Sequence, residues 1–133
     1  MNIKRYIISS IVVAAFVFVY DWIFHGMCMK DIYMATAYLW RPKEVMMQYM
    51  PWMTLGQVSF AFIFSYIFLK GYENKGIMEG VRYGLLIGLL FVPATLIDYA
   101  VLPYPPKLII YWDIGTFIEL SLAGVILAKV YRP

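Results

Sequence analysis

The sequence predicts an all-α integral membrane protein with four transmembrane helices. Of its 133 residues, 63% are apolar and only 14% are charged, whereas soluble domains carry about a quarter charged residues. The mean hydropathy is +0.73, and four apolar runs approach the length of about 20 residues that crosses a bilayer. These observations exclude a soluble globule and a disordered chain, and a single cysteine excludes a disulfide scaffold.

The apolar runs are expected to be helices of one membrane domain covering residues 1–133. Inside a bilayer only helices and closed barrels satisfy their own backbone groups, and the runs lack the alternating pattern of barrel strands. The predicted spans, in chain order, are residues 6–29, 52–69, 81–102 and 108–128.

The segments around these spans have signals of their own. The first span follows Lys4 and Arg5, but it is too long for a signal peptide and lacks a small-residue cleavage site, so we expect it to remain uncleaved. Residues 30–51 mix aromatics, methionines and a few charges, which predicts either a segment lying in the outer interface or an irregular packed loop. A polar turn at 71–76 joins spans two and three, and the prolines of 103–106 predict a tight hairpin between spans three and four.

The positions of the basic residues predict the orientation. With both termini in the cytoplasm, seven Lys and Arg lie inside and four outside, which favours an N-in/C-in protein of the cell inner (plasma) membrane. The first outer loop is itself fairly basic. Because the Lys and Arg residues do not form a basic patch elsewhere, we expect the lipid bilayer as a partner and no nucleic acid. The inner set is Lys4, Arg5, Lys70, Lys75, Arg82, Lys129 and Arg132, and the outer set is Lys30, Arg41, Lys43 and Lys107.

Self-comparison predicts an internal repeat. One shift of the chain aligns Asp21 with Asp98, and a second shift aligns Gly56 with Gly115. Each half would then be a helical hairpin, and the two tandem hairpins would point the same way, related by a pseudo-two-fold axis along the membrane normal. The matching residues are few, so chance similarity between apolar spans is the alternative.

Half of the acidic residues lie inside the predicted spans, although none of the eleven Lys or Arg lies deep in one. A charge at the centre of a membrane helix costs about 2.5–3.5 kcal/mol on insertion scales. Such residues therefore point to function. The set is Asp21, Asp98, Asp113 and Glu119, together with His25.

These residues predict a proton-binding or cation-binding pocket that opens to the outside, built by spans one, three and four. His25 follows Asp21 by one helical turn, so both share a face, and Asp113, Thr116 and Glu119 recur on one face of span four. Crowded carboxylates in a low dielectric share protons or a cation, and oxygen ligands with one imidazole suit a divalent metal ion such as Mn, Zn or Fe. Alternatively the acids are neutral and hydrogen-bonded and only fix helix packing, above all Asp98 and Asp113. In that case His25 is a hydrogen-bond partner of Asp21.

Two further patterns carry weaker predictions. Seven of the nine methionines fall between Met27 and Met53, and soft ligands such as Met27, Cys28 and Met29 would select Cu(I), although methionine is also an adaptable filler on interaction surfaces. In span three small residues recur every four positions, a pattern that brings helix backbones together within one chain or between two. These residues are Gly80, Gly84 and Gly88.

Together the patterns favour binding or conduction of a proton or metal cation, with Asp21 and Glu119 as the principal carboxylates. The alternative is a non-catalytic accessory or assembly subunit, whose outer segment and glycine ridge contact a larger membrane complex. Four short spans leave little room for a pore in one copy, so a homo-oligomer or a complex is expected. Cu(I) handling and an intramembrane aspartyl hydrolase are lesser alternatives. Because nucleotide loops, hydrolase elbows and zinc-ligand spacings are absent, the sequence favours transport or binding over catalysis.

Overall fold

A computed structural model describes residues 1–131, and every regular element in that range is helical. Four helices are long and apolar enough to cross a membrane, as the sequence predicts: Ile3–Cys28, Met50–Lys70, Ile77–Val101 and Pro106–Val130. Their outward faces expose large apolar side chains, such as Trp22, Leu90 and Ile97, and this surface suits a lipid bilayer. Arg132, one of the bases used for the orientation, lies outside the described residues.

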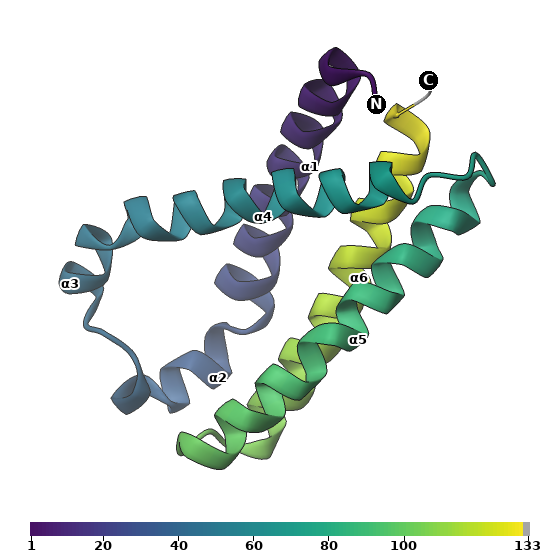
Figure 1. Cartoon of the computed structure of the whole chain (residues 1–133). Helices are drawn as coiled ribbons and strands as arrows, with labels where there is room; N and C mark the ends of the chain where they lie inside the picture. Colours follow the sequence, from purple (N-terminus) through teal and green to yellow (C-terminus); the bar gives the residue numbers. More distant parts are fainter. Residues whose placement is uncertain (132–133) are drawn as a thin grey trace.

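The helical elements follow one another with few irregular residues (Figure 1). All four long helices start before the predicted spans and two of them, the second and the fourth, also end after them, because polar residues next to an apolar run continue the same backbone hydrogen bonding. α5 starts directly after Gly76, whose φ of 79° favours glycine, and α6 starts at Pro106, where a missing N–H does no harm. The elements are α1 (Ile3–Ile23), the π-helical turn η1 (Phe24–Cys28), α2 (Lys30–Ala35), the 3-10 turn η2 (Ala37–Leu39), α3 (Lys43–Gln48), α4 (Met50–Lys70), α5 (Ile77–Val101) and α6 (Pro106–Val130).

The segment between the first two long helices is folded rather than irregular. It consists of α2, η2 and α3, and it leads from the end of α1 to the start of α4 (Figure 1). Thr36 is buried between α2 and η2, where its hydroxyl donates to the carbonyl oxygen of Ile32 at 2.7 Å and accepts from Trp40 Nε1 at 3.0 Å.

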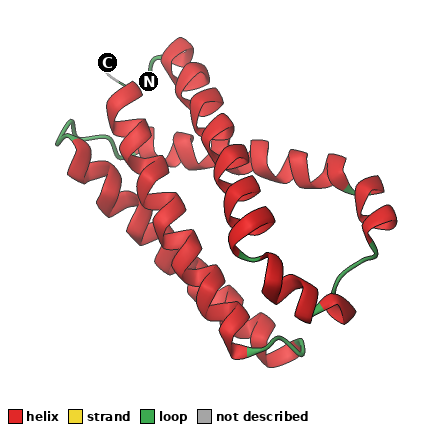
Figure 2. Cartoon of the chain, turned by 180° about the vertical axis from the view of Figure 1, so that it is seen from behind, coloured by secondary structure: helices red, strands yellow, loops and turns green. Residues whose placement is uncertain are grey.

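The second pair of long helices, α5 and α6, lies side by side along its whole length (Figures 1 and 2). Glycine makes this possible. A Cβ atom on Gly80 would lie 2.0 Å from the Gly124 carbonyl oxygen, and one on Gly84 would lie 2.1 Å from that of Leu120. Gly88 faces the ring of Phe117. The glycine ridge therefore packs within the hairpin and is not free to contact a partner, contrary to its role in the accessory-subunit hypothesis.

The first pair of long helices packs differently, because α4 runs across α1 rather than along it (Figure 1). The buried residues of α1 are small or β-branched, which allows close approach: Ser9, Ser10, Val13, Ala14 and Val17. Val13, Ala14 and Val17 belong with parts of α4 and α6 to the hydrophobic core of the molecule. Each half thus contains two long helices, but the two helices pack against each other differently in the two halves.

Tyrosine hydroxyls tie neighbouring helices together through backbone carbonyl oxygens. Tyr6 on α1 donates to Phe62 O on α4 at 3.1 Å, and Tyr20 on α1 donates to Gly115 O on α6 at 2.7 Å. Tyr83 on α5 donates to Phe64 O on α4 at 2.6 Å. Each bond satisfies a polar group that a bilayer cannot solvate.

Both described ends of the chain lie at one end of the molecule, which we call the terminal end (Figure 1). There the backbone N–H of Asn2 lies 3.5 Å from the Tyr131 hydroxyl, and the ring of Tyr72 packs edge-on against that of Tyr131. The opposite, distal end carries α2, η2 and the connection between α5 and α6. At this end Trp40 stacks on Tyr104 with ring centroids 5.9 Å apart.

Candidate functional site

The centre of the molecule holds a polar cavity of about 230 Å³. Its polar lining consists of Asp21 from α1, Gln57 from α4, and Thr116 and Glu119 from α6. The remaining lining is apolar and includes Phe91, the one contribution of α5: Val17, Gly56, Phe60, Phe91 and Leu120. The expectation that spans one, three and four build the pocket is therefore incomplete, because all four long helices line it: span two supplies Gln57, whereas span three contributes only the apolar Phe91.

Asp21 is the most connected of the acids. Gln57 Nε2 donates a hydrogen bond of 2.7 Å to Asp21 Oδ2, and Glu119 on α6 lines the same cavity as Asp21. Two carboxyl groups that share a poorly solvated cavity favour a state in which one of them keeps its proton. The cavity therefore contains a carboxyl pair that can hold a proton.

Gln57 was missed by reasoning from titratable residues alone. The available signal was a long amide side chain near the start of an otherwise apolar helix. A buried amide needs partners for its donors and acceptor, and this amide finds one in Asp21.

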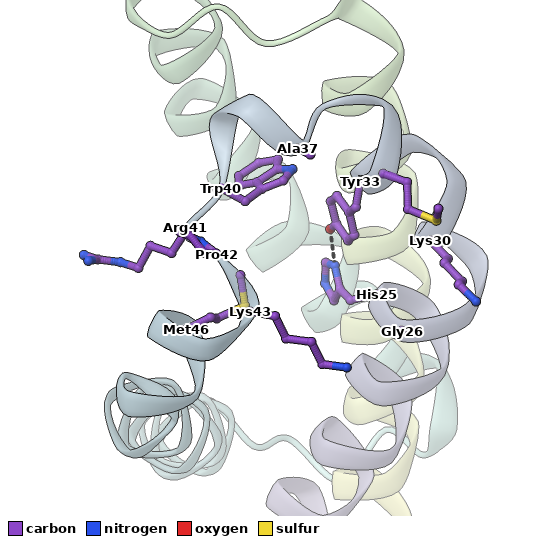
Figure 3. A pocket seen from close by; sticks show the side chains of 11 residues that line it. His25, Gly26, Lys30, Tyr33, Ala37, Trp40, Arg41, Pro42, Lys43 and Met46 are labelled. Carbon is purple, nitrogen blue, oxygen red and sulfur yellow. Dashed lines mark hydrogen bonds between the residues drawn. The ribbon is translucent and has the colours of Figure 1, made fainter.

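His25 continues the polar chain toward the distal end. Its Nε2 atom lies 3.7 Å from Asp21 Oδ1, one turn along α1, and its Nδ1 atom lies 2.5 Å from the Tyr33 hydroxyl (Figure 3). His25 lies in the π-helical turn η1, a rare element that is frequent at functional sites.

The hydrogen bonds around Tyr33 favour one tautomer of neutral His25. Trp112 Nε1 donates to the Tyr33 hydroxyl oxygen at 2.7 Å, and an indole N–H is only a donor. This leaves the Tyr33 proton available for His25 Nδ1, an arrangement that favours the tautomer with the ring proton on Nε2, the nitrogen that faces Asp21. Burial raises the pKa of Tyr33, so the phenol keeps its proton at neutral pH.

Of the five predicted site residues, Asp21 and Glu119 line one cavity, His25 approaches Asp21 to 3.7 Å, and the other two lie apart. The Thr95 hydroxyl on α5 lies 2.8 Å from Asp113 Oδ1 on α6 and 2.9 Å from the Val92 carbonyl oxygen, so Asp113 links the two helices of the hairpin. Asp98 is exposed on α5. Asp21 and Asp98, the proposed symmetry mates, thus occupy different environments.

The structure does not bring the predicted sulfur ligands together, and the described residues contain no group suited to a metal ion. Met27 is 64% exposed and Met29 is 1% exposed, and Cys28 between them is exposed, so the three side chains lie in different surroundings. Within residues 1–131 no three His, Cys, Asp or Glu side chains are grouped so that they could hold a metal ion.

The chain matches no protein-family model, no curated protein and no solved structure.

Proposed function

We propose that this protein binds a proton at the Asp21–Glu119 carboxyl pair and conducts it along a chain of side chains to the distal end. The observation that carries the proposal is a row of neighbouring acid, imidazole and phenol side chains. It starts at Glu119 in the middle of α6, which lines one cavity with Asp21, and continues through His25, whose Nε2 lies 3.7 Å from Asp21 Oδ1, to Tyr33 in α2. Intramembrane proton pathways are built from such acids and histidines.

The same contacts favour a proton over a metal cation as the bound species. Gln57 directs an N–H donor at Asp21 Oδ2, and a donor is not a metal ligand. His25 would have to present Nε2 to the metal without its proton, whereas a hydrogen bond donated by Tyr33 to Nδ1 favours the tautomer with the proton on Nε2. The carboxyl pair needs only one shared proton.

The membrane placement forms part of the proposal. We place the four long helices across an inner (plasma) membrane with the terminal end in the cytoplasm, following the distribution of Lys and Arg. The distal end and its aromatic side chains then lie at the outer interface, where Trp and Tyr are enriched. In this placement His25 and Tyr33 connect the central cavity to the outer surface.

The predicted repeat and the predicted oligomer also remain proposals. A common origin of the two hairpins rests on the sequence matches alone, since the packing of the pairs differs. A homo-oligomer would supply the inner half of the pathway, because below Glu119 the buried residues of α1, α4 and α6 are apolar ones such as Val13, Phe64 and Leu127 together with the serines Ser9, Ser10 and Ser65, and they include no acid or histidine.

A proteoliposome assay tests the function. We expect Glu119→Gln to reduce proton flux, followed with an entrapped pH-sensitive dye, by about a hundredfold, the scale of a positioned proton-transfer group. Asp98→Asn is the matched control. It removes an acid that lies in a long helix but does not belong to the proposed proton pathway, so this variant should keep wild-type flux. Equal flux in wild type and Glu119→Gln would overturn the proposal.

One observation supports the alternative function as an accessory subunit of a larger complex. The segment α2–α3 exposes large apolar side chains, including Met34, Tyr38 and Met47, and such surfaces are frequent at interaction sites. Co-purification of a stoichiometric second protein from native membranes, abolished by Tyr38→Ser, would favour this function over proton conduction.

A further inference from the structure

A second cavity, of about 480 Å³, opens at the distal end. It lies between the π-helical turn η1 on one side and the segment α2–η2–α3 on the other (Figure 3). It touches the proton chain only at His25 and Tyr33, so most of its lining has no part in the proposed function.

The wall of this cavity is mainly apolar. Its apolar members are drawn from α2, η2, α3 and the residues between them: Met34, Ala37, Trp40, Pro42 and Met46. Methionine side chains adapt to flexible apolar ligands. A small hydrophilic ion alone would leave this wall unused.

Cationic groups complete the lining, and no acidic residue belongs to it. Lys43 extends from α3 across the cavity toward α1, while Lys30 stands on the opposite wall at the start of α2 (Figure 3). In the described part of the chain neither ammonium group has a carboxylate within 4.0 Å. Arg41 points away from the cavity, and its guanidinium lies 3.8 Å from the centroid of the Tyr49 ring.

We infer that this cavity binds an anionic phospholipid, with the phosphate at Lys30 and Lys43 and an acyl chain along the Met34–Trp40–Met46 wall. A lysine ammonium binds phosphate as a point charge, and basic pockets at the membrane surface bind lipid head groups. Trp40 and Tyr33 are the residue types that lie at head-group depth.

A bound phosphate also explains why basic residues gather in the segment that the proposed orientation places outside. Three of the four bases assigned to the outer side line this one cavity, namely Lys30, Arg41 and Lys43. The positive-inside bias disfavours bases in a short outer loop. An outer-leaflet phosphate gives two of them a partner.

Native mass spectrometry of the full chain in detergent tests the inference. We expect the wild-type protein to retain one phosphatidylglycerol and to show much weaker retention of phosphatidylcholine, whose head group has no net charge. Inorganic phosphate is the third arm. Binding of inorganic phosphate without retention of phosphatidylglycerol, or equal retention of both lipids, would overturn the lipid assignment.

Two variants locate the bound lipid. Lys30→Gln combined with Lys43→Gln should weaken phosphatidylglycerol binding by about thirtyfold, because each lysine near an anionic surface contributes a factor of about five. Lys4→Gln combined with Lys129→Gln removes the same charge at the terminal end and should bind as the wild type does. Ala37→Phe keeps every charge but fills the cavity, so it should also lose the lipid. Equal binding by wild type and both cavity variants would refute the site.

Discussion

At the scale of single residues, the function depends on which atom carries each proton. His25 is the only histidine of the chain, and its two ring nitrogens face different partners, Tyr33 on one side and Asp21 on the other. The Trp112 donor supports this asymmetry from another helix, α6, because it donates to the Tyr33 oxygen and leaves the phenol proton available for His25.

We predict that neutral His25 exists as the Nε2–H tautomer and that Tyr33→Phe abolishes this preference. Phenylalanine retains the ring stacked on His25 at a centroid distance of 6.0 Å but removes the hydroxyl that donates to Nδ1. Nitrogen-15 NMR of histidine-labelled protein gives one signal pair that reports the tautomer directly. Tyr38→Phe, at an exposed tyrosine of the same segment, is the control. An Nδ1–H tautomer in the wild type would contradict the assigned chain.

Part of this site could be predicted from the sequence, and part could not. Asp21, His25 and Glu119 stand out because ionisable groups are costly in apolar helices. Tyr33 and Trp112 could not be selected, because the chain has twelve tyrosines and four tryptophans and only the folded segment α2–η2–α3 places Tyr33 between His25 and Trp112. Asp98 carries the same sequence signal as Asp21 yet lies on an exposed face, since a one-dimensional pattern does not specify which side of a helix meets its neighbours.

At the scale of elements, the α5–α6 hairpin is held by backbone contact. Gly80 and Gly124 face each other, and a Cβ atom on Gly124 would lie 1.9 Å from the Gly80 carbonyl oxygen. Neither backbone can move away alone, because both helices are continuous on each side of the contact.

We predict opposite effects for two glycine-to-alanine substitutions in long helices. Gly124→Ala should destabilise the protein by about 1–3 kcal/mol, the usual cost of overpacking. Gly56→Ala in α4 should stabilise it by about 0.5–1 kcal/mol, because a Cβ there meets nothing within 4 Å and alanine favours the helix. Reversible unfolding in mixed micelles measures both. Destabilisation of similar size in the two variants would argue against the close contact.

The number of long helices was predictable from the sequence, whereas their packing partners were not. Each span is apolar on all sides, so no amphipathic face marks the contact surface, in contrast to helices of soluble proteins. The glycine ridge predicted a close contact but could not identify Gly124 and Leu120 as the facing residues. The crossing of α1 by α4 had no sequence signal, because small residues permit close approach at many angles.

At the scale of the whole molecule, the structure separates two ends with different chemistry. The terminal end gathers Asn2, Tyr131 and the polar turn, in which both oxygens of Glu79 accept backbone N–H bonds, from Glu73 and Lys75. The distal end gathers aromatic side chains and the basic cavity. In a membrane these ends would face opposite compartments.

We predict that Cys28 is labelled from the outer side by a membrane-impermeant maleimide. Cys28 is the single cysteine and is exposed at the distal end of the first long helix. In right-side-out vesicles it should react without permeabilisation. Cys28→Ser combined with Lys75→Cys moves the thiol to the exposed turn at the terminal end and should react only after permeabilisation. The reverse pattern would invert the proposed topology and place the proton chain on the cytoplasmic side.

The π-helical turn at Phe24–Cys28 has a consequence for how the site is assembled. A π turn contains one residue more than an α-helical turn, and each residue of an α-helix rotates the side-chain direction by about 100°. The direction of the side chains therefore changes within the turn that carries His25, and Met29 ends this helix before α2 begins. Asp21 precedes the turn and Tyr33 follows it in a separate helix, so the turn and Met29 together set how Tyr33 meets the imidazole. Deleting one residue within the turn would change that meeting, although every side chain of the site would still be present.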